Sequence, residues 1–174
     1  MSGQTLLNAV ARVVGGTQPS NALTTASAGP PDQRPYWFSG LETGDGSGVA
    51  GLAGCWSLPL ESLTNTPVAM VLPDTGSDLD AFPTQGHRRL ENLIHVRVLT
   101  GHGDLQSNMA ALVNFDDLVQ AAFNSHMTLF NEPNVDTAWC SPGTYLEVAW
   151  PEGTVYTAVQ FVVRVHRSIP VTYS

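Results

Sequence analysis

The sequence predicts an α+β protein with one mainly antiparallel sheet, two or more helices packed on one face of it, and a long Gly/Pro-rich loop or arm. Three observations support this prediction: a helical period at the N-terminus, alternating apolar residues near the C-terminus, and an uneven distribution of Gly and Pro. Residues 15–92 hold 11 Gly and 8 Pro, whereas residues 93–174 hold 4 of each. We expect a single domain over residues 1–174, with a loop or insertion at 15–65 and a regular part at 66–174.

The N-terminal segment has the apolar spacing of an amphipathic helix. Within residues 2–14, apolar side chains recur at offsets 0, 1, 4, 7 and 8, namely Leu6, Leu7, Val10, Val13 and Val14. This spacing is typical of a helix that buries one face. Ser2 is suited to cap its start, and Gly15 with Gly16 is suited to end it.

Two strands are expected in the middle of the chain. Apolar residues fill the stretch from Pro67 to Pro73, which indicates a short buried strand bounded by prolines. In residues 93–100, apolar and polar side chains alternate, which predicts a second strand with one buried face. Its apolar positions are Ile94, Val96 and Val98. Residues 17–63 show no sustained period of either kind.

A helical tract is expected after the Gly101-His102-Gly103 turn. Asn114 is suited to cap a second helical segment, and Asp117 at its third position suits the positive end of the helix dipole. The apolar stripe expected of this segment is Leu118, Val119, Ala122, Phe123 and Met127. Because proline cannot continue a helix, we expect the segment to end near Asn131-Glu132-Pro133.

The C-terminal region predicts a β-hairpin. From Val155 to Val165 the odd positions are Val, Thr or Phe, which predicts a long half-buried strand with one apolar face; the even positions are Tyr156, Ala158, Gln160, Val162 and Arg164. Residues 144–150 are expected to form its partner. Pro151-Glu152-Gly153 between them suits a tight turn, because proline presets the first turn residue and glycine accepts a left-handed conformation.

The charge balance excludes several classes of function. The chain has 15 acidic and 7 basic residues, and every basic residue is Arg. A formal net charge of −8 without any Lys disfavours nucleic-acid binding by phosphate neutralisation and docking on anionic membranes. The chain has no run of about 18 apolar residues and no basic segment at its start, so we expect a soluble protein without a secretion signal.

A GxGxxG pattern occupies residues 46–51. A dinucleotide site would need a strand before this pattern and a helix after it, so that backbone N–H groups aim at the pyrophosphate. The flanking sequence has neither, and Pro59 interrupts the stretch where the helix would run. We therefore expect a Gly-rich loop without a cofactor. A P-loop is excluded because the chain has no lysine to reach a phosphate.

Asp74-Thr75-Gly76-Ser77 follows an apolar strand and resembles the active-site turn of aspartic proteases. Such a site needs a second carboxylate, which only a homodimer would supply here because the motif occurs once. We expect a simple turn, since Pro-Asp-Thr-Gly is favourable turn chemistry. A calcium site built from Asp74, Asp78 and Asp80 is a further alternative, although the EF-hand spacing and its terminal Glu are missing.

The remaining reactive side chains predict structural contacts, with no catalytic residue, cofactor or bound metal. Cys55 and Cys140 each adjoin a Trp and are expected as small buried residues. The histidines lack metal-ligand spacing, and two of them fall on outward strand positions; they are His87, His95, His102, His126 and His166. The arginines expected to pair with the acidic excess or to lie at interfaces are Arg88, Arg89, Arg97, Arg164 and Arg167.

Four aromatic residues in the Gly/Pro-rich half are expected in the core or at a subunit interface. They are Tyr36, Trp37, Phe38 and Trp56. Large aromatic rings bury much apolar surface in either setting. The alternative for these rings is a patch that binds carbohydrate or a partner protein.

Several of the expected elements together resemble the tail terminator and neck proteins of long-tailed bacteriophages. They are the N-terminal amphipathic helix, the Pro-Val-Ala-Met-Val-Leu-Pro strand, the Ile-His-Val-Arg-Val-Leu strand, the helix with the Leu-Val-x-Ala-Ala-Phe stripe, and the closing hairpin. The resemblance covers residues 2–14 and 66–173. The segment from Gly15 to Asn65 departs from the family pattern, and we expect it to reach a neighbouring subunit or the tail tube.

The resemblance implies a structural virion protein, assembled in the host cytoplasm, that forms a ring, usually a hexamer. Such a ring caps the tail tube, stops its polymerisation and joins the tail to the head connector, and it has no catalytic residues. Its implied partners are copies of itself, the tail tube protein and the head-tail connector or neck proteins. Another neck or tail subunit, such as a tail tube or head completion protein, is the alternative. DNA would pass through the lumen without specific binding, because acidic walls repel phosphate.

Overall fold

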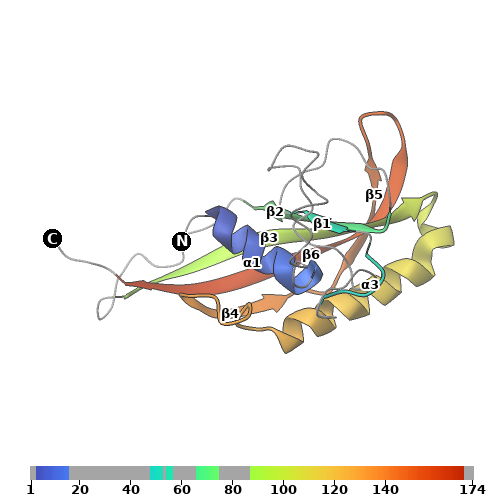
Figure 1. Ribbon diagram of the computed structural model, residues 1–174. Coiled ribbons are helices and arrows are strands. Elements are labelled where there is room, and N and C mark those ends of the chain that lie inside the picture. Colours follow the sequence, from blue (N-terminus) through green and yellow to red (C-terminus); the bar gives the residue numbers. More distant parts are fainter. Residues whose placement is uncertain (1–2, 16–47, 53, 57–65, 75–86, 171–174) are drawn as a thin grey trace, which may run out of the picture.

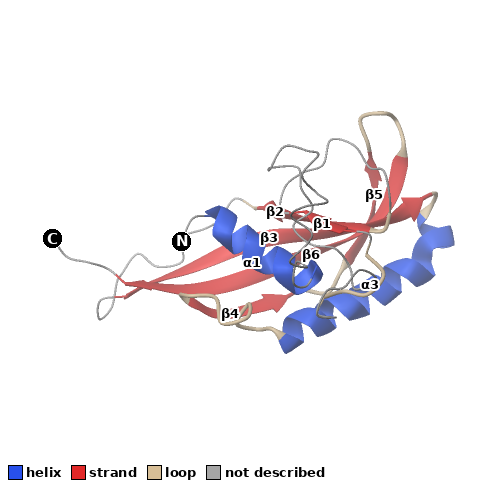
Figure 2. Cartoon of the chain, viewed as in Figure 1, coloured by secondary structure: helices blue, strands red, loops and turns tan. Residues whose placement is uncertain are grey.

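The computed structural model describes residues 3–15, 48–52, 54–56, 66–74 and 87–170. These residues form one mixed sheet of six strands, with two helices that lie over one face of it (Figures 1 and 2). The predicted α+β class is confirmed. In chain order the elements are α1 (Gly3–Gly15), β1 (Gly54–Trp56), β2 (Val68–Pro73), β3 (His87–His102), α3 (Leu105–Ser125), β4 (Val135–Cys140), β5 (Thr144–Ala149) and β6 (Val155–Pro170).

The two longest strands, β3 and β6, form the centre of the sheet. They pair antiparallel along their whole lengths, from His87 opposite Pro170 to His102 opposite Tyr156. On the far side of β3 the order continues with β2 and then β1, and the β1–β2 pair is parallel. On the far side of β6 lie both β4 and β5, each antiparallel to it. All pairs except β1–β2 are therefore antiparallel, as the sequence predicts.

β4 and β5 follow one another along the same edge of β6, separated by a break at Ser141-Pro142-Gly143. Ser141 fills the gap in the ladder, because its N–H donates to the Val162 carbonyl at 2.9 Å and its hydroxyl oxygen accepts from the Val162 N–H at 3.0 Å. The chain then closes the predicted hairpin, in which the Gly153 N–H donates to the Trp150 carbonyl at 2.8 Å. Gly153 has φ +87°, the left-handed conformation expected of it.

The main core lies between the helices and the sheet. All the apolar positions predicted for α1 are buried, and α3 contributes Leu112, Phe115, Val119 and Phe123. The sheet contributes alternate residues, among them Val96 of β3 and Phe161 of β6, which lie opposite each other and are fully buried. The one-sided alternation of β6 is thus confirmed. Alternation places these side chains on the helix-covered face.

The helical tract is one continuous helix, and two details predicted for it are wrong. Its cap is Asp104, whose carboxylate accepts from the Ser107 N–H at 2.8 Å, whereas Asn114 lies exposed in the helix interior. Its last residue is Ser125, so Met127 lies beyond the helix and is 51% exposed. Left-handed residues follow the helix and turn the chain toward β4; they are Leu129, Phe130, Asn131 and Asn134.

The Asp104 cap makes the stability of the fold depend on pH at the acidic end. The hydrogen bond from the Ser107 N–H holds the pKa of the Asp104 carboxyl below its usual value. Because the pKa is lower in the folded state, the stabilisation is present above the unfolded value of about 4 and is lost as pH falls through the folded value. We expect Asp104→Ala to melt at a lower temperature than the parent at neutral pH, and Asp104→Asn to fall between them. Circular dichroism melts should show the gap between parent and Asp104→Asn closing toward about pH 2; a constant gap would contradict this account.

Four parts of the sheet extend beyond the sequence prediction. β3 begins at His87, ahead of the expected start at residue 93, and β6 continues to Pro170. These polar ends show little alternation, but they pair with each other across the sheet. β4 and β1 were not predicted, since β1 has only three residues and β4 mixes polar and apolar side chains without a clear period.

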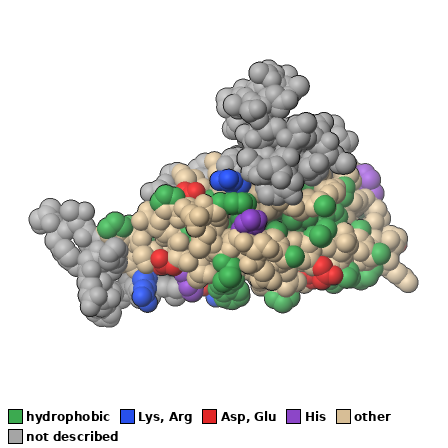
Figure 3. Space-filling view, turned by 60° about the horizontal axis from the view of Figure 1, so that its bottom comes forward, with side chains coloured by type: hydrophobic (Ala, Val, Ile, Leu, Met, Phe, Trp, Pro, Cys, Tyr) green, Lys and Arg blue, Asp and Glu red, His purple; other side chains and the backbone are tan. Residues whose placement is uncertain are grey.

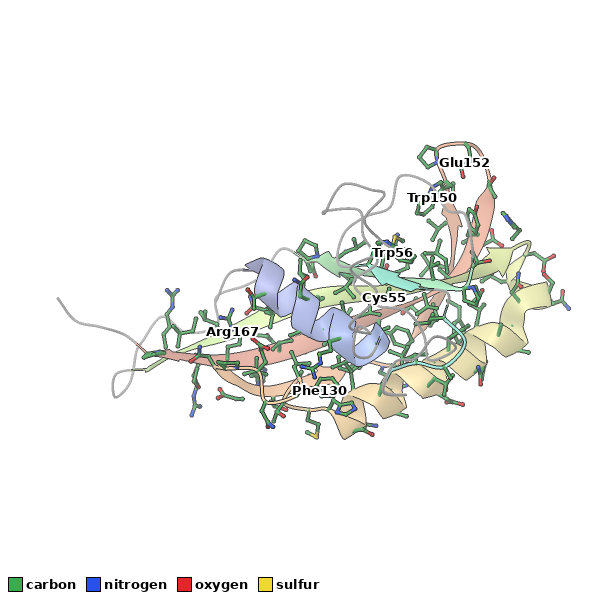
Figure 4. All side chains as sticks on the ribbon, viewed as in Figure 1. Cys55, Trp56, Phe130, Trp150, Glu152 and Arg167 are labelled. Atoms are coloured by element: carbon green, nitrogen blue, oxygen red, sulfur yellow. The ribbon has the colours of Figure 1, made fainter. Side chains whose placement is uncertain are left out.

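A second apolar cluster lies on the sheet face opposite the helices. Its buried members are Val68, Met70, Leu99, Trp150, Tyr156 and Ala158. The sequence predicts a half-buried strand for β6, and this is wrong near the hairpin, where Tyr156 and Ala158 are buried on the second face as well. The covering side chains include Trp150 of the hairpin turn and Trp56 of β1, labelled in Figure 4. The edge of Trp150 contacts the Tyr156 ring, with centroids 5.8 Å apart.

Most of the Gly/Pro-rich segment predicted as a loop at 15–65 lies outside the described residues. The described part is a turn at residues 48–52 followed by β1, so the prediction of a loop is wrong for the strand. Val49 donates its N–H to the carbonyl of Val14 at 2.7 Å, which ties this part to α1. Val49, Leu52 and Cys55 are buried in the main core. Within the described ranges, neither helix has the length and apolar character needed to span a membrane.

Candidate functional site

Seven of the 15 acidic residues lie in one continuous stretch that contains no Lys or Arg. Residues 98–163, all of which the structure describes, carry seven carboxylates: Asp104, Asp116, Asp117, Glu132, Asp136, Glu147 and Glu152. This stretch forms α3, β4, β5 and the hairpin turn. In Figure 3 the right-hand part of the molecule shows apolar and acidic side chains and no Lys or Arg. In the described residues, α3, β4, β5 and the hairpin turn thus contribute carboxylates to the surface and no Lys or Arg.

Within the described ranges, the hairpin end of the molecule carries three exposed carboxylates. Asp104 at the start of α3, Glu147 of β5 and Glu152 of the turn are all exposed. Glu152 is labelled at the tip of the hairpin in Figure 4. Exposed carboxylates repel other anions over about one Debye length, which is near 8 Å at physiological salt.

The opposite end of β6 carries a basic and aromatic cluster on the face away from the helices. The Arg164 guanidinium lies 3.3 Å from the Glu91 carboxylate and 5.2 Å from the centroid of the Trp139 ring. His166 lies 3.4 Å from the same carboxylate. Trp139 is 41% exposed, and the side chains of Arg164 and His166 are each 43% exposed. We call Glu91, Trp139, Arg164 and His166 the sheet patch.

A second exposed feature lies on the outer face of α3. Met109, Val113 and Asp117 follow one another at intervals of four residues and so share one side of the helix. Met109 is 40% and Val113 42% exposed, and Asp117 is also exposed. We call these three residues the helix stripe. Because α3 buries its other side against the sheet, the helix stripe points away from the sheet patch.

Asp116, next to the helix stripe, joins α3 to the break between β4 and β5. One oxygen of its carboxylate accepts from the Gly143 N–H at 3.0 Å and from the Gln120 side chain at 2.6 Å. The other accepts from the Tyr145 hydroxyl at 3.0 Å. A Cβ on Gly143 would overlap Val159 of β6, so only glycine lets the chain pass this close to the sheet. Asp116 therefore has a structural role that its sequence context did not indicate.

The arginines predicted as ion-pair partners behave in two ways. Arg164 pairs with Glu91, as expected. Arg97 instead donates to the side-chain oxygen of Gln160 at 2.6 and 3.1 Å, and burial lowers its pKa. Arg167, labelled in Figure 4, is 5% exposed and donates to the neutral Asn92 side chain at 3.4 Å. The ion-pair prediction is therefore wrong for Arg97 and Arg167 among the interactions of the described residues.

Asp74 lies just past the end of β2, where its N–H donates to the Leu93 carbonyl at 3.2 Å. Its carboxylate lies 3.0 Å from the imidazole of His95 on β3. The residues opposite His95 on its two neighbouring strands are Leu72 and Val162, neither of which has a reactive group. The described residues thus bring an imidazole to Asp74, whereas an aspartic protease needs a second carboxylate. The rest of the motif and the other two candidate calcium ligands, Asp78 and Asp80, lie outside the described residues.

The described part of the GxGxxG pattern does not have the geometry of a dinucleotide site. Gly48 and Gly51 have φ +111° and +88°, so they form a turn, and the segment after them is the strand β1. A dinucleotide loop must lead into a helix whose N-terminal N–H groups receive the pyrophosphate.

His102, His126 and the two cysteines serve as packing residues in the described structure. His102 packs on Tyr156, and His126 stacks on Phe130 at 4.1 Å between ring centroids. Both cysteines are free thiols; Cys55 is fully buried, and burial raises the pKa of Cys140 to about 12. Neither is a thiolate near neutral pH. In the described ranges, His, Cys, Asp and Glu do not gather in threes or more in a way that would hold a metal ion.

Of the four aromatic residues predicted for the core or an interface, the structure describes Trp56. Trp56 packs against the second apolar cluster, which fits the core alternative. Tyr36, Trp37 and Phe38 lie outside the described residues.

Neither a comparison with models of known protein families nor a comparison with curated protein sequences gave a match.

The surfaces most suited to binding were missed by sequence reasoning. Trp139 was noted only as a neighbour of Cys140, because β4 had not been predicted. Met109 and Val113 lie before Asn114, which the sequence predicts as the start of a second helical segment. Numbering the helix from Asp104 places Met109 and Val113 side by side, one turn apart, and this is the available signal.

Proposed function

We propose that this chain is a structural virion subunit that forms a ring at the end of a phage tail tube, ends polymerisation of the tube and joins the tail to the head connector. Support comes first from the elements that carry the family resemblance. The N-terminal helix, the β2 and β3 strands, the second helix and the closing hairpin are all present, in the expected order, in the described residues. Its partners are further copies of itself, the tail tube protein and neck proteins, and its place is the virion after assembly in the host cytoplasm.

The observation that carries the proposal is the stretch of residues 98–163, with its seven carboxylates and no Lys or Arg. Genomic DNA has to slide through such a ring, and a cationic lumen would hold it by releasing counterions from the phosphates. An acidic lumen repels it instead. We place the hairpin end, with Asp104, Glu147 and Glu152, toward the channel. Six copies would bring six times the formal charge of −8.

The first test is the assembly state of the purified chain. Native mass spectrometry should find a closed oligomer, with six copies as the expected number, and negative-stain electron microscopy should show rings. Mixed with tail tube protein, the chain should shorten or cap growing tubes. A chain that stays monomeric with and without tube protein would overturn the proposal. A chain that polymerises by itself into open tubes would instead identify a tail tube subunit.

The lumen is tested in the same rings with double-stranded DNA. Parent rings should not retain DNA in a gel-shift assay at about 0.15 M salt. Rings of the double variant Glu147→Lys, Glu152→Lys should retain it, since four elementary charges per subunit have been shifted toward positive. A matched double variant in a different acidic region, Glu132→Lys with Asp136→Lys, should bind much less. Equal binding by the two variants would contradict the placement of the hairpin end.

A further inference from the structure

The helix stripe and the sheet patch lie on opposite faces of the same two-layer fold. α3 packs on the sheet through Leu112, Phe115, Val119 and Phe123, so its outer side points away from the sheet. The sheet patch lies on the far face, since Arg164 alternates along β6 with Val163 and Val165, which are buried under the helices. A surface on each face allows one copy to contact a copy in front of it and another behind it.

The outer side of α3 has the composition of an interface. Its exposed residues are Gln106, Met109, Ala110, Val113, Asn114, Asp117, Ala121 and Asn124. A solvated helix face usually carries several charges, but this one has a single carboxylate in about five turns. Interface cores are depleted in charged residues and enriched in Met. The exposed Met109 and Val113 are therefore better explained by a covered face than by a free one.

The sheet patch has the complementary composition. Trp and Arg are the residues that most often dominate binding energy at interfaces. Stacking on Trp139 and pairing with Glu91 already hold the Arg164 guanidinium in place. A side chain that is fixed before binding loses less conformational entropy when a partner covers it.

The charged residues of the helix stripe and of the sheet patch favour contact between these two unlike surfaces. The helix stripe lies within the stretch that has no Lys or Arg and includes Asp117, with Asp116 beside it. The sheet patch presents Arg164 and His166 around one carboxylate that they already share. Stripe against stripe brings carboxylates together, which is unfavourable across an interface, and patch against patch brings together two Arg164 side chains that each already have a carboxylate partner. Stripe against patch is the attractive combination.

We propose that the helix stripe of one subunit packs on the sheet patch of the next, with Asp117 near Arg164, as the repeated head-to-tail contact of the ring. This inference rests on the proposed ring and adds which surfaces close it. Unlike faces that meet form a heterologous contact, and such contacts generate a closed ring when the rotation between copies divides a full turn. The occupant of each surface is thus a second copy of this chain.

The test uses one variant for each side of the contact. Val113→Glu should break the stripe and leave the patch intact, and Trp139→Glu should break the patch and leave the stripe intact. Each alone should raise the concentration needed for half-assembly by about 30-fold or more. Mixed in equal amounts, they should form a 1:1 dimer that grows no further, because one stripe and one patch remain usable. Native mass spectrometry distinguishes this dimer from rings and monomers.

Controls keep the outcomes separate. Val155→Glu makes the same change at a residue of the same type and the same 42% exposure, outside both surfaces, and should still form rings. Arg164→Gln is a second patch variant and should pair with Val113→Glu in the same way, which guards against misfolding of the Trp139 variant; circular dichroism melts check both. Rings from both single variants, a dimer of either variant alone, or a mixture that stays monomeric would each overturn the contact. A parent chain that is itself monomeric would instead overturn the proposed ring, and the contact with it.

Discussion

Replacement of Phe161 by alanine is expected to lower the free energy of unfolding by about 3–5 kcal/mol. Phe161 is fully buried in β6, the strand that pairs with β3 on one side and with β4 and β5 on the other. It lies opposite Val96, and the helices cover this face. Removal of the ring would leave a cavity among neighbours from several elements, which cannot all move in to fill it. Urea unfolding followed by circular dichroism measures the loss.

Two further substitutions in β6 serve as references for the loss of unfolding free energy expected from Phe161→Ala. Phe161→Leu keeps most of the volume and should cost about 1.5 kcal/mol or less. Val162→Ala changes the next residue, which faces the opposite side and is half-buried, and should cost less than about 1.5 kcal/mol. A loss below about 2 kcal/mol for Phe161→Ala would mean that the core is looser at its centre than the burial of Phe161 indicates.

Asp116→Ala should have the second largest effect, a loss of about 2–3 kcal/mol in the free energy of unfolding. The carboxylate accepts hydrogen bonds from Gly143, Gln120 and Tyr145, and so fixes the break between β4 and β5 against α3. Hydrogen bonds to a charged group are worth more than neutral ones, and the Gly143 N–H would be left without its acceptor. Chemical unfolding of the variant, with ring formation as a second measurement, tests both stability and assembly.

The contribution of Asp116 can be divided by its partners. Tyr145→Phe removes one hydrogen bond and should cost about 1 kcal/mol. Added to Asp116→Ala, it should cost much less, because the bond is already absent and contacting residues are not additive. Full additivity of the two substitutions would show that the Tyr145 hydroxyl does not depend on Asp116.

The elements predicted well from the sequence were those with one apolar face and a clear end. α1 and the β5–β6 hairpin are of this kind, because Gly15 and the Pro151-Glu152-Gly153 turn mark where they stop. β1, β4 and the first part of β3 lack such a pattern. Their strand conformation depends on backbone pairing with distant segments, such as Asn92 with Val165, and pairing of this kind leaves no local period.

The candidate surfaces depend on tertiary structure even more. Glu91 and Arg164 are 73 residues apart, and their meeting requires the register of β3 against β6. The charge distribution, in contrast, could be read directly, because the stretch without Lys or Arg is continuous in the chain. The helix stripe is intermediate in how far it can be predicted from the sequence. Its residues are close together in the chain, but their direction away from the sheet follows only when the helix is known to begin after Asp104.

The interruption at Ser141-Pro142-Gly143 has a consequence for aggregation. A long unbroken strand at the edge of a sheet offers its free N–H and C=O groups to any further strand, and this is how chains add to one another into fibres. In the described sheet one edge is the three-residue β1, and the other is divided into two strands of six residues by a proline that has no N–H to donate. Neither edge is a good template. We expect copies of this chain to join through their faces, where an assembly can close, and not through edges, where growth has no end.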